Sequence, residues 1–315
     1  AGTVRNSSGL IAGDIVQIKA DEIINETQVY TQDVRFGSNT TDIQQRAGFD
    51  GTIAGNTGVM IEAEGTFLSK GGVLASNGDI VVKANEAIFD SIALRDYRET
   101  NVTVKGSFSK TNTHTIEETL THQGSEIAAG GSFLLQTDCD ATFRGANVSV
   151  GESAMFDIGG NMNVLAVKDY TYSYYKQDKS SFGGLIKEEH TKISEAERLA
   201  ASNVMVQDGL TIVSGNNTNV IGSNIYAGGD ANIYTGYKVN DDGTLEKTGT
   251  NGSLNVLADY VSAMEFEEHI KRNVLKYFDL DNSFSGGTFS AFVTVGSVTL
   301  DMTEYSTSTA VCPNI

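Results

Sequence analysis

Five aspartates are the first candidates for chemistry in this sequence, because paired carboxylates can cleave glycosidic bonds. They are Asp79, Asp138, Asp140, Asp208 and Asp230. Retaining or inverting hydrolysis needs two carboxyl groups held about 5–9.5 Å apart across a groove. Asp79, Asp208 and Asp230 lie beside glycine, where an Asp side chain usually bonds its own backbone in a turn. No Lys or Arg recurs near them in register. A structural role in turns is therefore the favoured prediction, and a carbohydrate-active enzyme, a polysaccharide lyase or hydrolase, is the alternative.

Histidines and short motifs point away from a metal or a catalytic centre. The four histidines are His114, His122, His190 and His269, and none belongs to an HExxH or HxH motif. The sequence contains no GxxxxGK[ST] phosphate loop and no GxSxG nucleophile turn. The repeat of calcium-binding β-rolls is missing too. We therefore predict no catalytic residue, no metal site and no cofactor.

A run of tyrosines is the candidate contact surface. Tyr170, Tyr172, Tyr174 and Tyr175 lie within six residues, and the first three alternate with smaller or polar residues as in a strand. Such rings can stack on a glycan or on a partner protein. More commonly they cover the face of their own hairpin, and both uses stay open.

Composition argues against several classes of partner. The chain has 22 Lys and Arg against 40 Asp and Glu, a net charge of −18. This balance argues against nucleic acid bound through its phosphates and against docking on an anionic lipid surface. Glycine accounts for 34 of 315 residues and proline for one, which favours many tight turns over disorder. No apolar run is long enough for a membrane-spanning helix. Whether Cys139 and Cys312 pair stays open, because sequence does not show proximity.

An internal repeat predicts the architecture. The segments 124–137 and 222–235 share Gly, Ser, Ile, Ala, Gly, Gly and Thr at seven matched positions. A finer repeat begins at residues 50, 71, 124, 145, 201 and 222, which pair at a separation of 21 residues. Three, nine and eleven residues after each start, every position is apolar. The three columns are Ile53, Leu74, Ile127, Val148, Val204 and Ile225; Val59, Ile80, Phe133, Ala154, Leu210 and Ala231; and Ile61, Val82, Leu135, Phe156, Ile212 and Ile233.

These columns predict a stack of coils. Two columns lie two residues apart, the period of a strand with one buried face, and Gly, Asn and Asp clusters supply the turns. A coil of about 21 residues cannot bury its apolar face alone, so coils stacked about 4.8 Å apart would line each column into an interior ladder. We predict an all-β fold, a right-handed parallel β-helix or β-solenoid. A β-sandwich, the alternative, does not explain columns in register.

Three segments leave the 21-residue pattern, each opened by an Asp-Tyr pair. They cover about 96–122, 169–200 and 259–300, and we expect them as β-hairpins that project from the shaft. The distal part of the second segment, 188–202, fits either a short helix or a second strand.

Two further segments also depart from the strict repeat. The NDDG core of residues 237–249 predicts a hairpin inserted into a coil. Residues 9–25 have the pattern of a looser coil, and Gly9 precedes Gly51 by 42 residues, twice 21.

Three phrases carry a resemblance to a known family: GSNIYAGGDANIYTG, GDIVVKANEAIF and NVLAVKDYTYSYYKQDKSSFGG. They resemble the haemagglutinin repeats of filamentous-haemagglutinin-like two-partner-secretion exoproteins. The closest likeness is to the second repeat region of contact-dependent growth-inhibition toxins, and it covers most of residues 9–300. The family's NPN-type secretion motif and a cytotoxic C-terminal domain are not recognisable here. Residues 1–315 are therefore expected to be a single β-helical repeat segment, an internal fragment of a longer exoprotein.

The resemblance also implies a function. It implies a non-enzymatic β-helical shaft of a large secreted exoprotein, used in contact-dependent toxin delivery or in adhesion to another cell. The implied partners are the outer-membrane transporter of the two-partner system and a receptor or the outer membrane of a target cell. The implied location is secreted and outer-membrane-associated, on the cell surface of a Gram-negative bacterium.

The C-terminal sequence is expected to stop as a new coil begins. Residues 309–315 align with 121–127, which puts Cys312 in the place of Gly124 and Ile315 in that of Ile127. An open β-helix end exposes strand edges and apolar ladder residues, so natural solenoids cap their ends. We therefore expect the solenoid to continue beyond residue 315 and its exposed end to promote end-to-end self-association.

Overall fold

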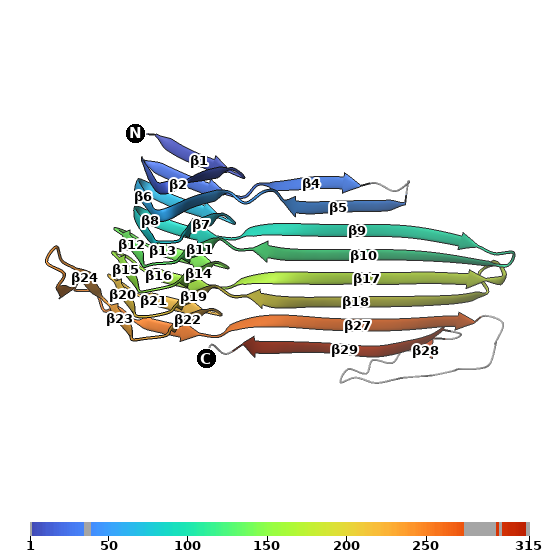
Figure 1. Cartoon of the computed structure of the whole chain (residues 1–315). Helices are drawn as coiled ribbons and strands as arrows, with labels where there is room; N and C mark the ends of the chain where they lie inside the picture. Colours follow the sequence, from blue (N-terminus) through green and yellow to red (C-terminus); the bar gives the residue numbers. More distant parts are fainter. Residues whose placement is uncertain (1, 35–38, 274–293, 296–297, 313–315) are drawn as a thin grey trace.

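The computed structural model describes residues 2–34, 39–273, 294–295 and 298–312. Within these residues the chain is all-β apart from one short 3-10 turn. A parallel sheet forms a coiled shaft, and an antiparallel sheet extends from one side of it (Figure 1). None of the described residues forms a helix that could span a membrane.

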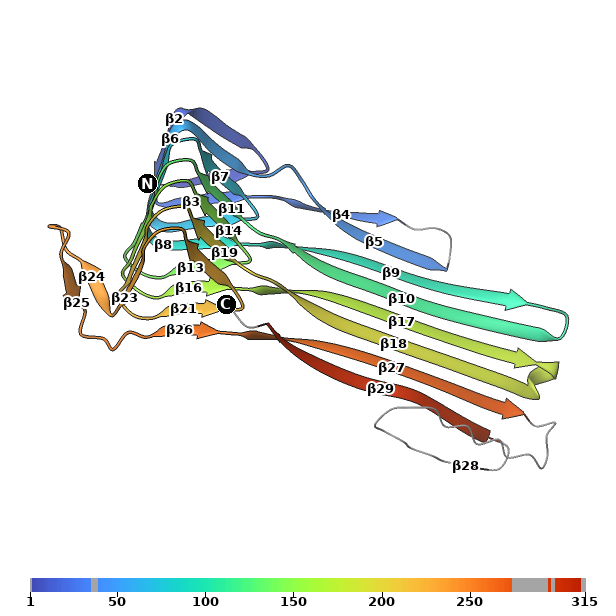
Figure 2. The same ribbon diagram turned by 60° about the horizontal axis from the view of Figure 1, so that its bottom comes forward.

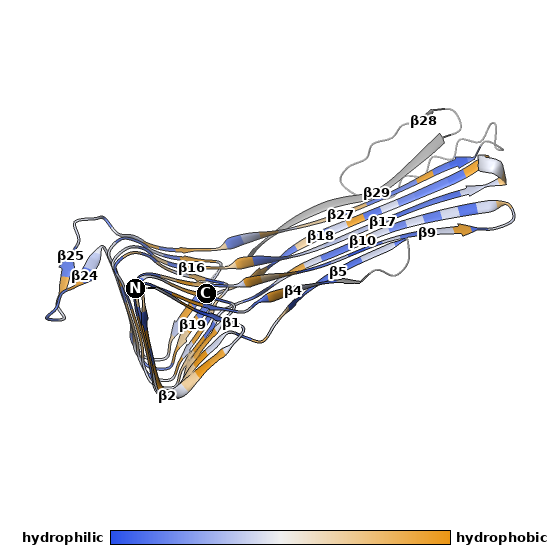
Figure 3. Ribbon diagram, turned by 90° about the horizontal axis from the view of Figure 1, so that it is seen from above, coloured by the Kyte–Doolittle hydropathy of each residue, from blue (hydrophilic) through white to orange (hydrophobic). Residues whose placement is uncertain are grey.

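The shaft is built from coils that each contribute strands to three faces, which give it a triangular outline seen from above (Figure 3). Every strand in it pairs in parallel with strands of the neighbouring coils. In the first coils the strands run together around the corners, and from residue 126 onward each face has its own short strand. The strands are β1 (Thr3–Ser7), β2 (Leu10–Ala20), β3 (Glu22–Glu26), β6 (Thr52–Lys70), β7 (Val73–Ser76), β8 (Asp79–Asp90), β11 (Glu126–Ala129), β12 (Phe133–Thr137), β13 (Ala141–Arg144), β14 (Asn147–Val150), β15 (Ala154–Ile158), β16 (Met162–Leu165), β19 (Asn203–Val206), β20 (Leu210–Ser214), β21 (Thr218–Ile221), β22 (Asn224–Ala227), β23 (Ala231–Thr235) and β26 (Leu254–Leu257).

The predicted columns are confirmed as ladders of directly paired residues. In the first column, Ile127 pairs with Leu74 on one side and with Val148 on the other. The second and third columns have the same order, from Val59 and Ile61 through to the last coil. All column residues before the last coil are buried, whereas those of the last coil are more exposed because no described strand covers them.

Phenylalanines fill the interior of the middle coils. Phe89 stacks on Phe143 with ring centroids 4.7 Å apart, and Phe156 lies 5.4 Å from Phe133 and 5.9 Å from Phe143. All four are at most 1% exposed. Because each ring touches rings of neighbouring coils, the core couples the coils along the shaft.

The antiparallel sheet consists of hairpins that leave the shaft after every second coil (Figure 2). Neighbouring hairpins pair with each other, β10 with β17 and β18 with β27, so that one continuous sheet lies beside the shaft. Its strands are β4 (Val29–Val34), β5 (Thr40–Ala47), β9 (Ile92–Lys105), β10 (Ser109–Gln123), β17 (Val167–Ser181), β18 (Ile186–Ala200), β27 (Asp259–Asn273), β28 (Thr294–Val295) and β29 (Val298–Cys312).

Of the two alternatives for residues 188–202, the structure has the strand, β18. The 3-10 turn Phe182–Gly184 lies at the tip between β17 and β18. The third predicted segment, 259–300, contains residues 274–293 and 296–297, which lie outside the described residues.

The start of the chain differs from the sequence expectation. Ile11 pairs directly with Ile53, 42 residues away, so this interval holds one coil and not two. The remaining residues form an additional hairpin, β4–β5, that joins the antiparallel sheet through β9. This hairpin lacks the Asp-Tyr opening of the others, and its length coincides with one extra coil, which explains the error.

The inserted hairpin in residues 237–249 is confirmed. β24 (Tyr237–Val239) pairs with β25 (Leu245–Lys247), and Gly243 has a φ of 79° in the turn. It projects from the shaft on the side opposite to the antiparallel sheet (Figure 3).

Candidate functional site

The four predicted tyrosines lie on β17, in the middle of the antiparallel sheet. Successive side chains of a strand point to opposite faces. Tyr170, Tyr172 and Tyr174 therefore share one face, which we call the tyrosine face, and Tyr175 lies on the other. The structure thus brings three of the four candidates together and separates the fourth.

The tyrosine face also contains apolar residues of the neighbouring strands. Tyr174 lies between Ile116 on β10 and Ile193 on β18, and Phe266 on β27 is the next residue in the same row. All four side chains are half-buried. Sequence reasoning missed this row, because its members come from three hairpins.

Partial burial also affects the phenol groups. Burial, aided by the nearby charge of Glu195, raises the pKa of Tyr170, and burial followed by the neighbouring Tyr174 raises that of Tyr172. Both phenols therefore stay neutral and remain hydrogen-bond donors near pH 7. The tyrosines cover the sheet and still present part of their rings to solvent.

Histidine–carboxylate pairs connect the hairpins. His122 Nδ1 lies 3.0 Å from Asp169 Oδ1, which joins β10 to β17, and His190 Nε2 lies 2.7 Å from Glu267 Oε1, which joins β18 to β27. Within the described residues, no three His, Cys, Asp or Glu side chains are grouped in a way that could hold a metal ion. His122 and His190 thus link neighbouring strands through these carboxylates.

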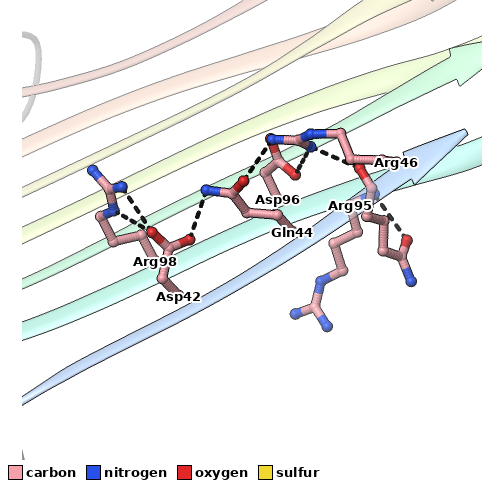
Figure 4. A network of polar contacts seen from close by, with 7 residues as sticks. Asp42, Gln44, Arg46, Arg95, Asp96 and Arg98 are labelled. Atoms are coloured by element: carbon pink, nitrogen blue, oxygen red, sulfur yellow. Dashed lines mark hydrogen bonds and ion pairs between the residues drawn. The ribbon is translucent and has the colours of Figure 1, made fainter. Parts of the chain in front are cut away.

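A polar network attaches the short first hairpin to β9 (Figure 4). Arg98 donates to Asp42 Oδ2 from Nε and from Nη2, at 3.2 and 2.7 Å, and Gln44 donates to Asp42 Oδ1 at 3.1 Å. Arg46 bonds both Gln44 and Asp96. The hydrogen bonds from Arg98 hold the pKa of the Asp42 carboxyl below its usual range.

Acid should release the first hairpin. A carboxyl group with a depressed folded-state pKa contributes stability that is complete above its unfolded pKa of about 4, and this contribution is lost as the pH falls through the folded-state value. We expect amide-exchange protection of residues 40–44 to decrease below about pH 4, and Asp42→Asn to show low protection even at pH 7. The exposed Asp241→Asn serves as the control. Unchanged protection in Asp42→Asn would contradict the assigned role.

Two of the five candidate aspartates bond between coils. Asp79 Oδ1 accepts a hydrogen bond from the backbone N of Ser132 at 2.8 Å, and Asp140 Oδ1 accepts one from Asn161 N at 2.7 Å. The turn position of Asp79 predicts a bond to its own backbone, whereas its partner Ser132 belongs to the next coil. No hydrogen bond of the Asp208 or Asp230 side chain was found in the described part of the chain. Asp79 and Asp140 thus fit a structural role between stacked coils.

A shallow polar groove of about 380 Å³ on the shaft includes another candidate, Asp138. Lys19 and Glu62 in this groove form an ion pair at 2.9 Å, and Lys83 lies beside them. The hydrogen bond from Lys19 lowers the pKa of Glu62, so that this carboxyl has no proton to donate near neutral pH. Burial, followed by the charge of Asp138, raises the pKa of the neighbouring Asp157.

Comparisons with known proteins agree with this architecture of repeats. A family model described as hemagglutinin repeat matches residues 2–184. A protein named 16S rRNA endonuclease CdiA, from Enterobacter cloacae subsp. cloacae, is 29% identical over 125 residues, which cover 39% of this chain and 4% of that protein. No solved structure matches. Since the family model spans more than half of the residues, the chain belongs to the hemagglutinin-repeat family, as a filamentous-haemagglutinin-like repeat region.

Proposed function

We propose that this chain is part of the non-enzymatic shaft of a large secreted exoprotein, used in contact-dependent toxin delivery or adhesion to another cell. In this proposal residues 1–315 are a single segment of a longer, right-handed β-helix with coils of about 21 residues. The observation that carries it is the shaft itself, where ladders of paired apolar residues join successive coils into one stiff rod. The hairpins at about 96–122, 169–200 and 259–300 would then present surfaces beside the rod.

The named relative supports the toxin-carrier version of this proposal. It is called an endonuclease, and the matched part is 4% of its length. The described residues of the present chain include no metal-binding group of His, Cys, Asp or Glu side chains. In our proposal the chain therefore holds and presents a toxic domain that lies elsewhere in a longer protein.

The proposed partners follow from this role. They are the outer-membrane transporter of a two-partner system and a receptor or the outer membrane of a target cell, with no nucleic acid. The proposed location is the cell surface of a Gram-negative bacterium. Tyr170, Tyr172 and Tyr174, together with Tyr175 on the other face, are the proposed partner contacts of the sheet.

The last described coil is a second proposed contact surface. Ile225, Ile233 and Val256 line an open apolar groove of about 200 Å³ at this end. Apolar ladder residues without a covering strand favour association with a further coil. End-to-end self-association of the isolated chain is therefore proposed as a consequence of this surface.

Removal of the β17–β18 hairpin tests the proposal. Val167 and Ala200 are direct cross-strand partners at its base, so a short Gly/Ser turn can replace residues 171–198. The shaft ladders on both sides do not involve these residues. In the full-length exoprotein we expect growth inhibition of target cells, or adhesion to them, to decrease at least about tenfold while the far-ultraviolet circular dichroism spectrum of the isolated chain keeps its β-sheet form.

Removal of the β24–β25 hairpin is the matched control, since it shortens the chain on the other side of the shaft. Delivery and adhesion should persist in this variant. Global unfolding after removal of residues 171–198 would make that hairpin structural, and undiminished delivery and adhesion would exclude it as a contact surface.

The polar groove favours a second candidate function, a carbohydrate-active enzyme. It provides Lys19 and Lys83 near Asp138, and burial raises the pKa of the Asp157 carboxyl, which is the direction that favours a general acid. Release of reducing ends from acidic polysaccharides, abolished by Asp157→Asn, would establish this alternative and contradict a purely structural shaft.

A further inference from the structure

A row of four cationic side chains crosses the distal end of the antiparallel sheet. In cross-strand register, Lys105 on β9 pairs with Lys110 on β10, Lys110 with Ser180 on β17, Ser180 with Lys187 on β18, and Lys187 with Arg272 on β27. Directly paired residues share a face, so Lys105, Lys110, Lys187 and Arg272 form one line. With strands about 4.8 Å apart, the line is about 19 Å long.

This cationic row is unfavourable for the sheet alone. Like charges directly opposite each other destabilise an antiparallel pair, and the row contains two such pairs, Lys105 with Lys110 and Lys187 with Arg272. Among the described residues, no carboxylate forms an ion pair with any of the four. The distal half of the first long hairpin, residues 101–113, contains no acidic residue in a chain of net charge −18. An anion outside the chain would remove the repulsion.

Two phenylalanines lie just beyond the cationic row, at the tips of neighbouring hairpins. Phe108 is 73% exposed and Phe182 is 56% exposed. Their ring centroids are 6.2 Å apart, and Phe182 N donates a hydrogen bond to Phe108 O at 2.8 Å. The two rings therefore form one exposed apolar tip, about 45 Å from the base of the hairpins at the usual rise per strand residue.

The backbone at this tip is strained. Phe182 has a φ of 52°, in the left-handed region that glycine and asparagine occupy more easily than a bulky residue. Strained conformations are found where function requires them. The aromatic side chain at this position does not improve the turn, which points to a use for the ring outside the hairpin.

We propose that the tip of the sheet docks on an anionic lipid surface. Phe108 and Phe182 enter the interface between headgroups and acyl chains, and the cationic row binds the phosphate groups above it. The net charge of the whole chain conceals this site, because the row itself contains no acidic residue. Asp178 and Glu189 lie in the next row toward the shaft and line the same groove as Lys110 and Lys187. The inference rests on the proposed function, since it assigns a surface to the contact with a target cell.

Vesicle binding tests the docking site with the full chain of 315 residues. We expect the chain to co-sediment with vesicles of phosphatidylglycerol and phosphatidylcholine, and at least about tenfold less with phosphatidylcholine alone. The chain has no tryptophan, so Phe108→Trp introduces a single indole whose emission should shift to the blue on anionic vesicles. No binding by the parent chain, or equal binding to both vesicles, would overturn the proposal.

Two double variants separate docking from a structural role. In Phe108→Ser/Phe182→Asn, asparagine tolerates the positive φ, so thermal stability should be equal or higher while vesicle binding falls at least about tenfold. In Lys105→Thr/Lys110→Thr, removal of the repulsion should likewise preserve stability while binding falls about 30-fold. Parent-like binding by either variant would overturn the proposal.

The controls are equally exposed residues away from the tip. Phe49→Ser removes a ring that is 88% exposed, and Lys70→Glu/Lys247→Glu changes two exposed lysines. These variants should bind as the parent does, and weakened binding in them would mean that the tip is not the site. Because vesicle binding needs no exoprotein or target cell, this proposal and the delivery function can fail independently.

Discussion

Replacing Phe156 with aspartate is expected to unfold most of the shaft. The side chain is 0% exposed and lies between Phe133 and Phe143, with Leu135 and Ile212 as its neighbours in the ladder. A carboxylate at this position would have no partner in an apolar interior, and the change should cost about 5 kcal/mol or more. In a solenoid the loss also uncouples the coils on either side.

The matched control for this prediction is Met205→Asp. Met205 lies on β19 with its side chain pointing outward, and it is 51% exposed. Its replacement should change stability by about 0.5 kcal/mol or less. Thermal melting followed by circular dichroism measures both variants, and a parent-like melting temperature for Phe156→Asp would contradict the buried ladder.

The shaft could be predicted from sequence because its repeat is strict. Each column residue has the same environment as its counterpart one coil away, so the apolar pattern recurs at a fixed spacing, as for Ile127 and Val148. The inserted hairpin at residues 237–249 could be predicted because a turn sequence interrupts that spacing.

The antiparallel sheet was harder to predict. Its strands alternate between two partly exposed faces, and such strands specify their register weakly. The pairing of β10 with β17 joins residues on two separate hairpins, for example Glu118 and Tyr172. No local sequence pattern predicts this pairing. The extra hairpin β4–β5 was missed because its length is close to that of one coil.

The candidate sites also differ in whether they could be predicted from a single strand. Alternation placed Tyr170, Tyr172 and Tyr174 on one face, since that property belongs to a single strand. The cationic row has members on four strands of three hairpins, so only the register brings Lys110 and Lys187 into line. A surface whose residues come from several strands can be recognised only in the structure, whereas a surface along one strand can be predicted from the sequence.

Replacing Gly124 with alanine should separate two coils at their corner. A Cβ atom at this position would lie 1.8 Å from the carbonyl oxygen of Gly145 in the next coil, a distance that backbone atoms cannot accommodate without moving apart. The adjacent ladder between Glu126 and Asn147 begins two residues later, so this movement would also weaken its hydrogen bonds. We expect a loss of about 3 kcal/mol or more in the free energy of unfolding.

Gly209→Ala distinguishes close packing from a general effect of glycine replacement. The nearest atoms to its added Cβ, Asp230 O and Ser153 Oγ, lie at 3.8 Å, an ordinary contact. Because alanine reduces the freedom of the unfolded chain, this variant should be unchanged or more stable by up to about 1 kcal/mol. Urea denaturation midpoints measure both changes. Equal midpoints for Gly124→Ala and Gly209→Ala would mean that the coils do not approach as closely at Gly124 as the structure places them, whereas a lowered midpoint for Gly124→Ala alone would identify this corner as a point where stacking depends on the absence of a side chain.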